Sequence, residues 1–202
     1  MRRRLVLAAV SVAVAGALTA AYAADVSIGT ITEGSVECAL TEQAAQALKD
    51  KNVSFEAVEP AATLPGNKVR WSPIKGQVST RLEGHVSASG GFSLRNRDGS
   101  SMEFIGPAGK VPSGTASFTV TTKTGEGTHE DDGPSPVLSY AIPSSSIHGK
   151  ADVTGKFKVS VDSADLHLTA SAAQRINSTF GTDLTADKPF WQCTLEAGGR
   201  IG

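Results

Sequence analysis

The segment His129-Glu130-Asp131-Asp132 places one imidazole and three carboxylates side by side in the chain. Oxygen and nitrogen ligands gathered in this way can attract a divalent cation. The segment lacks the glycine and the distal acid of an EF-hand loop, and Gly133 stands where the zinc-peptidase pattern His-Glu-x-x-His needs its second histidine. We therefore favour a solvated acidic loop, with these four residues as candidate metal ligands in the alternative interpretation.

Nucleophilic catalysis needs a serine or cysteine on a strained turn beside a base. The sequence has no Gly-x-Ser-x-Gly turn, and its serines stand in settings typical of turns and strand surfaces. Paired carboxylates of the kind that cleave glycosidic bonds leave no local pattern, so a secreted hydrolase remains an alternative. We predict that the protein is not an enzyme.

The first residues have the three parts of a secretory signal peptide. Residues 2–4 are all arginine, residues 5–18 are almost entirely apolar, and Ala-Tyr-Ala ends at Ala23. The apolar run is shorter than the ~20 residues that a membrane-spanning helix needs. We predict a cleaved signal peptide, residues 1–23, so that the mature chain reaches an oxidising compartment.

The remaining residues, 24–202, have the length expected of one domain with its own core. The chain contains 19 basic and 20 acidic residues, and three of the arginines leave with the signal peptide, so the mature domain is net negative. This charge argues against nucleic acid and anionic membranes as partners. We expect a monomer that is secreted or held at the cell envelope, with no membrane span after cleavage and no cofactor.

Cys38 and Cys193 are the only cysteines and stand near opposite ends of the mature chain. Both lie in alternating apolar and polar patterns, Val-Glu-Cys-Ala-Leu and Trp-Gln-Cys-Thr-Leu, which predict two strands that could pair. A disulfide between them is the favoured interpretation in an oxidising compartment. Free or metal-binding thiols are the alternative, although two cysteines do not make a zinc site by themselves.

Two segments with the pattern Leu-Thr-x-x-Ala-Ala-Gln predict short helices. The first runs from Leu40 to Leu48 and the second from Leu168 to Ile176. In each, a threonine precedes strong helix formers and is placed to cap the helix. The similarity is consistent with an internal duplication, and equally with a recurring solution for a strand that leads into a capped helix.

Between these helices the chain reads as many short strands separated by glycine and proline. Residues 156–161 show the clearest alternation, with apolar side chains on one face and polar ones on the other. This pattern predicts a mainly β protein, either an antiparallel β-sandwich or a barrel-like sheet with two short helices. Residues 121–136, which contain three glycines and two prolines, are predicted to form a long mobile loop.

Residues 82–94, Leu-Glu-Gly-His-Val-Ser-Ala-Ser-Gly-Gly-Phe-Ser-Leu, resemble a strand pair of HtaA-like domains from secreted and cell-wall actinobacterial proteins. Residues 168–173 and 177–182 are similar to the closing part of related secreted proteins. The resemblance covers the layout from about residue 39 to 195 and implies a haem-binding domain. HtaA domains bind the haem iron through a tyrosine that follows a Trp-Gly-x-Lys motif, whereas residues 26–38 contain neither tryptophan nor tyrosine.

Tyr140 is the only tyrosine left after signal cleavage. Tyr140 and His85 are therefore the candidate haem ligands under this resemblance. Our leading hypothesis is a secreted, non-enzymatic β-rich domain that binds a cell-surface component, a protein or a small ligand through its loops, with residues 121–136 foremost. Haem or metal capture of the HtaA-like type is the alternative, and a secreted hydrolase is the third.

Overall fold

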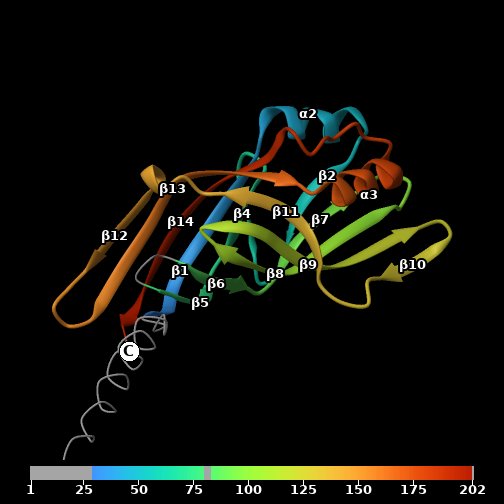
Figure 1. Ribbon diagram of the computed structural model, residues 1–202. Helices are drawn as coiled ribbons and strands as arrows, with labels where there is room; N and C mark the ends of the chain where they lie inside the picture. The colour runs from blue at the N-terminus through green and yellow to red at the C-terminus, as the bar shows by residue number, and fades with distance from the viewer. Residues whose placement is uncertain (1–28, 80–82, 202) are drawn as a thin grey trace, which may run out of the picture.

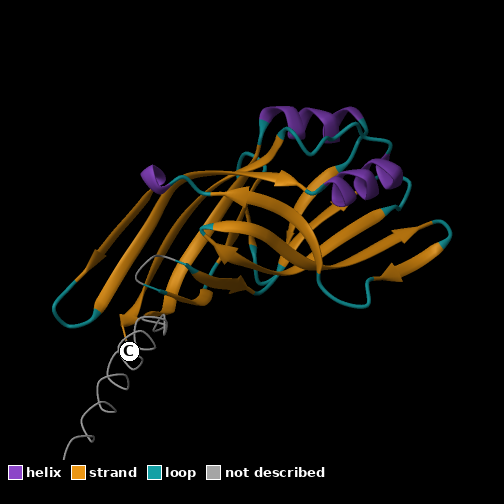
Figure 2. Cartoon of the chain, in the orientation of Figure 1, coloured by secondary structure: helices purple, strands orange, loops and turns teal. Residues whose placement is uncertain are grey.

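The computed structural model describes residues 29–79 and 83–201. Strands dominate these residues, and two α-helices lie on the same side of the sheet (Figures 1 and 2). The predicted signal peptide, residues 1–23, lies outside them. The strands of the first half are β1 (Gly29–Leu40), β2 (Ser54–Val58), β3 (Ala62–Leu64), β4 (Lys68–Trp71), β5 (Ile74–Val78), β6 (Gly84–Ala88) and β7 (Gly91–Arg95). The strands of the second half are β8 (Ser101–Val111), β9 (Ser113–Thr124), β10 (Gly127–Glu130), β11 (Ser135–Ala141), β12 (Ile147–Ala151), β13 (Lys156–Leu168) and β14 (Pro189–Ile201).

Eight of these strands close into an antiparallel barrel. The order around the barrel is β9, β11, β13, β14, β1, β5, β6 and β8, and pairing of β8 with β9 completes the ring. The mainly β prediction is confirmed, and of its two alternatives the barrel is the correct one. Closure pairs both edges of the eight-stranded sheet and so leaves this ring with no open edge. The strands β2, β3, β4, β7, β10 and β12 extend or flank the ring.

The first and last described strands are neighbours in the barrel wall. β1 pairs antiparallel with β14, and Gly29 lies opposite Ile201 in the register. Further along the same pair, Cys38 lies opposite Cys193, with their Cα atoms 4.1 Å apart, and the two form the predicted disulfide. The bond joins positions separated by 155 residues in the chain.

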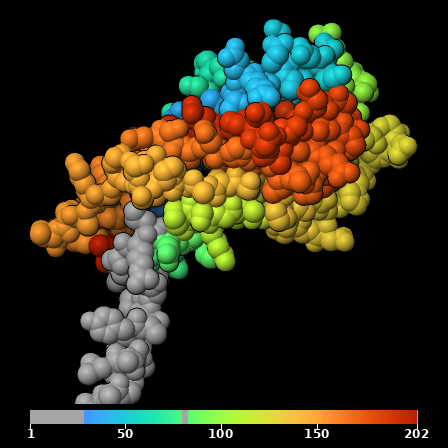
Figure 3. Space-filling view, turned by 45° about the horizontal axis from the view of Figure 1, so that its top comes forward, coloured from blue at the N-terminus to red at the C-terminus, as the bar shows by residue number. Residues whose placement is uncertain are grey.

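Both predicted helices form, and they are capped in the same way. Helix α2 (Glu42–Asp50) follows Thr41, and α3 (Ala170–Phe180) follows Thr169. Each threonine hydroxyl accepts a hydrogen bond from the N–H three residues on, and each donates to the carbonyl of a proline in a neighbouring strand, Pro189 or Pro136. This repeated contact fixes where each helix leaves the sheet. Figure 3 shows the surfaces over the two helices adjoining one another.

Residues 121–136 do not form the long loop predicted from their glycines and prolines. β9 continues to Thr124, the chain turns, and β10 returns along it with Thr128 opposite Lys123 and Glu130 opposite Thr121. The prediction was wrong because the many threonines of this segment favour strands on either side of a two-residue turn. The hairpin extends away from the barrel (Figure 1).

Aromatic side chains fill the part of the interior that is lined by β2, β7, β8 and β14. Phe92 stacks on Phe104 with ring centroids 4.4 Å apart, and the edge of Phe118 meets Phe92 at 5.7 Å. Trp191 packs against Phe92 at 4.6 Å and against Trp71 at 5.4 Å, in both cases edge to face. These geometries are the ones that aromatic pairs prefer.

Candidate functional site

The barrel interior contains an apolar cavity of about 130 Å³, which is partly open to solvent and lies beside the aromatic cluster. Its wall is built from inward-facing side chains of the barrel strands and β4. The cavity is lined by Val36, Cys38, Trp71, Ile74, Val86, Ala88, Ala108, Gly109, Val111, Ala116, Phe118, Leu138, Tyr140, Ile142, Val161, Ala164, Leu166, Trp191, Cys193 and Leu195, among others. Small residues leave the space, because Ala88, Ala116 and Ala164 occupy positions where larger aliphatic side chains would fill it.

Tyr140 is one of the few polar groups that line this cavity. It lies on β11 opposite Gly114, and its hydroxyl donates a hydrogen bond of 2.8 Å to the carbonyl oxygen of Lys110. Gly109 makes this position possible, since a Cβ atom there would lie 2.3 Å from the Tyr140 hydroxyl. Burial raises the pKa of Tyr140 above its ordinary value of 10.0. The phenol is therefore neutral at physiological pH.

His85 lies on the other side of the barrel wall. It is exposed on β6, whereas its neighbour Val86 faces the cavity, as the alternation of a strand requires. His85 lies beside Lys110 in the register and borders a shallow outer groove of about 510 Å³ that is shared with Gln77 and Ser113. The structure therefore does not bring Tyr140 and His85 together, since one faces inward and the other outward.

For the two tryptophans of the cavity wall, the strand-like sequence context indicates only core packing. Trp71 and Trp191 are 3% and 1% exposed, and neither indole N–H finds a hydrogen-bond partner in the described part of the chain. A buried donor without an acceptor costs about 1–3 kcal/mol. Among the buried side-chain polar atoms of the described residues, these two indole nitrogens are the ones without a hydrogen-bond partner.

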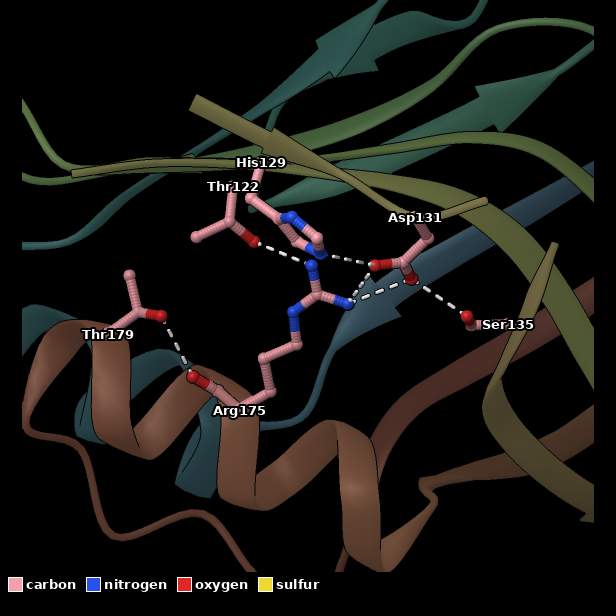
Figure 4. A network of polar contacts seen from close by, with 6 residues as sticks. All are labelled: Thr122, His129, Asp131, Ser135, Arg175 and Thr179. Atoms are coloured by element: carbon pink, nitrogen blue, oxygen red, sulfur yellow. Dashed lines mark hydrogen bonds and ion pairs between the residues drawn. The ribbon is translucent and has the colours of Figure 1, made fainter. Parts of the chain in front are cut away.

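The acidic segment predicted as a solvated loop is partly tied to helix α3 (Figure 4). Arg175 donates from one guanidinium nitrogen to both carboxylate oxygens of Asp131, at 2.7 and 2.8 Å, and from another to the Thr122 hydroxyl at 2.9 Å. Ser135 donates to Asp131 at 2.7 Å, and the His129 imidazole lies 3.8 Å from the same carboxylate. The Asp131 side chain is only 13% exposed.

The charge of Asp131 is favoured by these contacts. Partial burial acts to raise its pKa, but the hydrogen bonds from Ser135 and Arg175 and the positive charge of Arg175 outweigh burial, so the pKa lies below the ordinary 3.8. Solvation therefore describes Glu130 and Asp132, which are exposed, but not Asp131. The difference arises because Arg175 reaches the carboxylate from 44 positions away in the chain.

The candidate metal ligands His129, Glu130, Asp131 and Asp132 do not converge. Within residues 29–79 and 83–201, no three side chains of His, Cys, Asp or Glu are arranged to hold a metal ion. Cys38 and Cys193 are bonded to each other. Among the described helices, none combines the length and the apolar character that crossing a bilayer requires.

The fold is thus an HtaA-like closed barrel with two helices and an apolar interior. No family model matches the sequence, and no curated protein matches it either. Among solved structures, it is similar to the C-terminal domain of HtaA from Corynebacterium glutamicum, with a TM-score of 0.59 and 14% identity, over 86% of this chain and 99% of that one. It is also similar to the haem-binding protein HtaB from the same organism, with a TM-score of 0.56 and 14% identity, over 86% of this chain and 96% of that one. The resemblance inferred from the sequence is confirmed for the fold.

The interior cavity alone does not hold a whole haem group. Its volume of about 130 Å³ is close to the ~150 Å³ that accommodates a benzene ring, and far from the ~300–1,000 Å³ of sites for larger ligands. The Tyr140 hydroxyl is engaged with Lys110, and its raised pKa disfavours the phenolate that binds iron. His85 faces outward, so it does not contribute to the interior.

Proposed function

We propose that this protein is an exported, non-enzymatic binding protein for a small, largely apolar ligand, and that haem is the ligand class to test first. The observation that carries the proposal is the fold, which is similar to that of a haem-binding protein over 86% of this chain. The two similar structures are matched over 99% and 96% of their own lengths. The predicted signal peptide and the Cys38–Cys193 bond support export to an oxidising compartment.

The interior of the barrel supports a binding role more than a catalytic one. Its wall is almost wholly apolar, and the hydroxyl-bearing residues on it are Ser87, Tyr140 and Thr194, none of which is a general base at neutral pH. Apolar concave sites with a few placed polar groups are typical of small-molecule binding. For haem, the interior cavity is too small for the whole group, and the candidate ligands Tyr140 and His85 lie on opposite faces of the barrel wall, so at most one of them contacts the iron.

A haemin titration tests the haem proposal. The protein beginning at Ala24 is expected to give a saturable Soret band with one equivalent of haemin. Tyr140→Phe is expected to weaken binding at least about tenfold if the interior face is used, and His85→Ala if the outer groove is used. His148→Ala is the matched control, because His148 is also exposed but pairs with Asp162 on β13, away from both faces. A flat titration of the wild-type protein would overturn haem as the ligand.

A further inference from the structure

We propose that one end of the molecule is a surface that binds anionic lipid bilayers, and that the β12–β13 hairpin makes the main contact. Basic side chains of β12, β13 and β14 contact the lipid phosphates, and Val153 at the tip of the hairpin enters the headgroup region. The inference goes beyond the proposed ligand-binding function and does not depend on haem. It combines the charge of this end, its exposed apolar side chains and its place next to the start of the domain.

Four basic residues lie together on one face of three neighbouring strands. Lys150 on β12 lies opposite Lys158 on β13, and Lys156 on β13 lies opposite Arg200 on β14. Cross-strand partners share a face, and so do residues two apart in one strand, so the four side chains point to the same side. All four are exposed, whereas Phe157 on the opposite face is buried. Within the part of the chain that the structure describes, none of the four basic side chains forms an ion pair.

This arrangement is unfavourable in the free protein, because like charges directly opposite each other in antiparallel strands repel. Two acids lie close to the four basic residues. Asp152 is in the turn before Lys156, and the side chain of Glu33 lies over Gly198, which is opposite Lys158. Four positive charges against two negative ones leave this end cationic. The net negative charge of the whole domain, which argues against an anionic membrane, therefore does not describe this end.

Exposed apolar side chains lie at the same end. Among the described residues, the large apolar side chains that stand exposed are Val153 and Ile201, at 105% and 42%. The N–H of Ile201 donates to the Gly155 carbonyl at 2.7 Å, so the end of β14 lies beside the turn that carries Val153. The Asp152 carboxylate accepts two backbone N–H groups of this turn, at 2.8 and 3.0 Å, and so holds Val153 outward. Apolar side chains beside cations favour a bilayer over a soluble polyanion, which has no apolar region to receive them.

The predicted export route brings this end to a membrane. Gly29 lies opposite Ile201, and only residues 24–28 separate it from the predicted cleavage site. Fully extended, these residues span at most about 18 Å. A chain still joined to its signal peptide therefore has this end close to the bilayer. Figure 1 shows the β12–β13 hairpin and the outer ends of β1 and β14 toward the same end of the molecule.

Vesicle flotation tests the proposal on the protein beginning at Ala24. The probes are vesicles of phosphatidylcholine alone and of equimolar phosphatidylcholine and phosphatidylglycerol, at about 0.15 M ionic strength. The wild-type protein is expected to bind the anionic vesicles and not the neutral ones. Lys150→Gln with Lys158→Gln is expected to weaken this binding about thirtyfold, since each basic residue near an anionic surface contributes about fivefold. Lys51→Gln with Lys123→Gln removes the same charge at exposed positions elsewhere and is the matched control, with binding unchanged.

Val153 distinguishes a bilayer from other polyanions. Val153→Ser is expected to weaken binding to the anionic vesicles about fivefold and to leave binding to soluble polyphosphate unchanged. Because the two native cysteines are bonded to each other, Val153→Cys provides a single thiol for an environment-sensitive fluorophore. Its emission is expected to shift to the blue on the anionic vesicles. The same label at Glu126→Cys, on the exposed β9–β10 turn, is the control and should not shift.

The possible results separate clearly. Absence of wild-type binding to the anionic vesicles, or an equal loss in the control lysine variant, would overturn the proposal. Binding to polyphosphate together with vesicle binding that does not respond to Val153→Ser or to the label at position 153 would assign this face to a soluble polyanion, and the membrane role would fail. Since the lysine variant at the hairpin removes a repulsion, it is expected to unfold at no lower temperature than the wild type, so its loss of binding cannot be ascribed to unfolding.

Discussion

The two halves of the barrel interior differ in how they are filled. In one, the rings of Phe92, Phe104 and Phe118 touch one another at centroid distances between 4.4 and 6.3 Å. In the other, alanines and Gly109 leave an apolar cavity that ends at Tyr140. The packed half is completed by β7, which flanks the ring, whereas the hollow half is lined by ring strands and β4, and the two halves also differ in side-chain volume. The packed half supplies stability, and the hollow half supplies room for a ligand.

The largest expected effect concerns the disulfide, whose two cysteines line the cavity. Replacing both cysteines, as Cys38→Ser with Cys193→Ser, is expected to lower the free energy of unfolding by about 5 kcal/mol, because the bond closes a loop of 155 residues. Urea unfolding of the oxidised wild type and the double variant measures it. The reduced wild-type protein serves as the control and should match the variant. Equal free energies of unfolding in all three would show that the disulfide does not stabilise the fold.

The next effect compares the halves directly. Phe92→Ala is expected to cost about 3–5 kcal/mol, since it opens a void in a fully packed cluster. Val86→Ala removes a side chain that already borders the cavity and is expected to cost about 1 kcal/mol. Unfolding free energies in urea give both values. Similar losses at the two positions would contradict the contrast between packed and hollow halves.

A third effect lies outside the barrel, at the contact between the β9–β10 hairpin and α3. Asp131→Asn is expected to cost about 2 kcal/mol at neutral pH, because it weakens the charged hydrogen bonds with Arg175. The pKa of Asp131 is lowered in the folded state, so its contribution is present above the ordinary 3.8 and is lost as the pH falls through the lowered value. Unfolding curves of wild type and variant should therefore converge at about pH 2. Asp132→Asn, at an exposed neighbour, is the control and should leave stability unchanged at either pH.

The smallest expected effect is a gain. Ala116→Val adds two methyl groups to the hollow half and is expected to stabilise the protein by about 1 kcal/mol, because it fills space without displacing a packed side chain. Thermal unfolding measures the gain. A loss of stability would mean that the wall around Ala116 is already fully packed.

Elements governed by neighbouring residues could be predicted from the sequence. Thr41 and Thr169 cap the two helices as their patterns indicate, since capping depends on residues three positions apart. The alternation around Cys38 and Cys193 predicts strands that pair, and they do. The strand periodicity likewise predicts a mainly β fold, although it does not distinguish a sandwich from a closed barrel.

Features that depend on distant residues could not be predicted. The barrel closes because β8 pairs with β9 along one edge and with β6 along the other. The alternation of apolar and polar residues within a strand does not indicate which strands will pair. The partner of Asp131 comes from another element, α3, so the segment reads in isolation as solvated. The unpartnered indoles of Trp71 and Trp191 also depend on the assembled wall. Tyr140 is a candidate haem ligand because of its residue type, but its inward position follows only from the assembled fold.

The pairing of β1 with β14 places Gly29 and Ile201 at one corner of the molecule (Figure 1). A chain with neighbouring ends can be rejoined there and opened elsewhere without changing the order of strands in space. A short linker from Ile201 to Gly29, with new ends at the exposed turn between β9 and β10, would give a circular permutant with the same barrel. Reporter groups could then be fused at the β9–β10 turn, on the opposite side of the molecule from Gly29 and Ile201 (Figure 1).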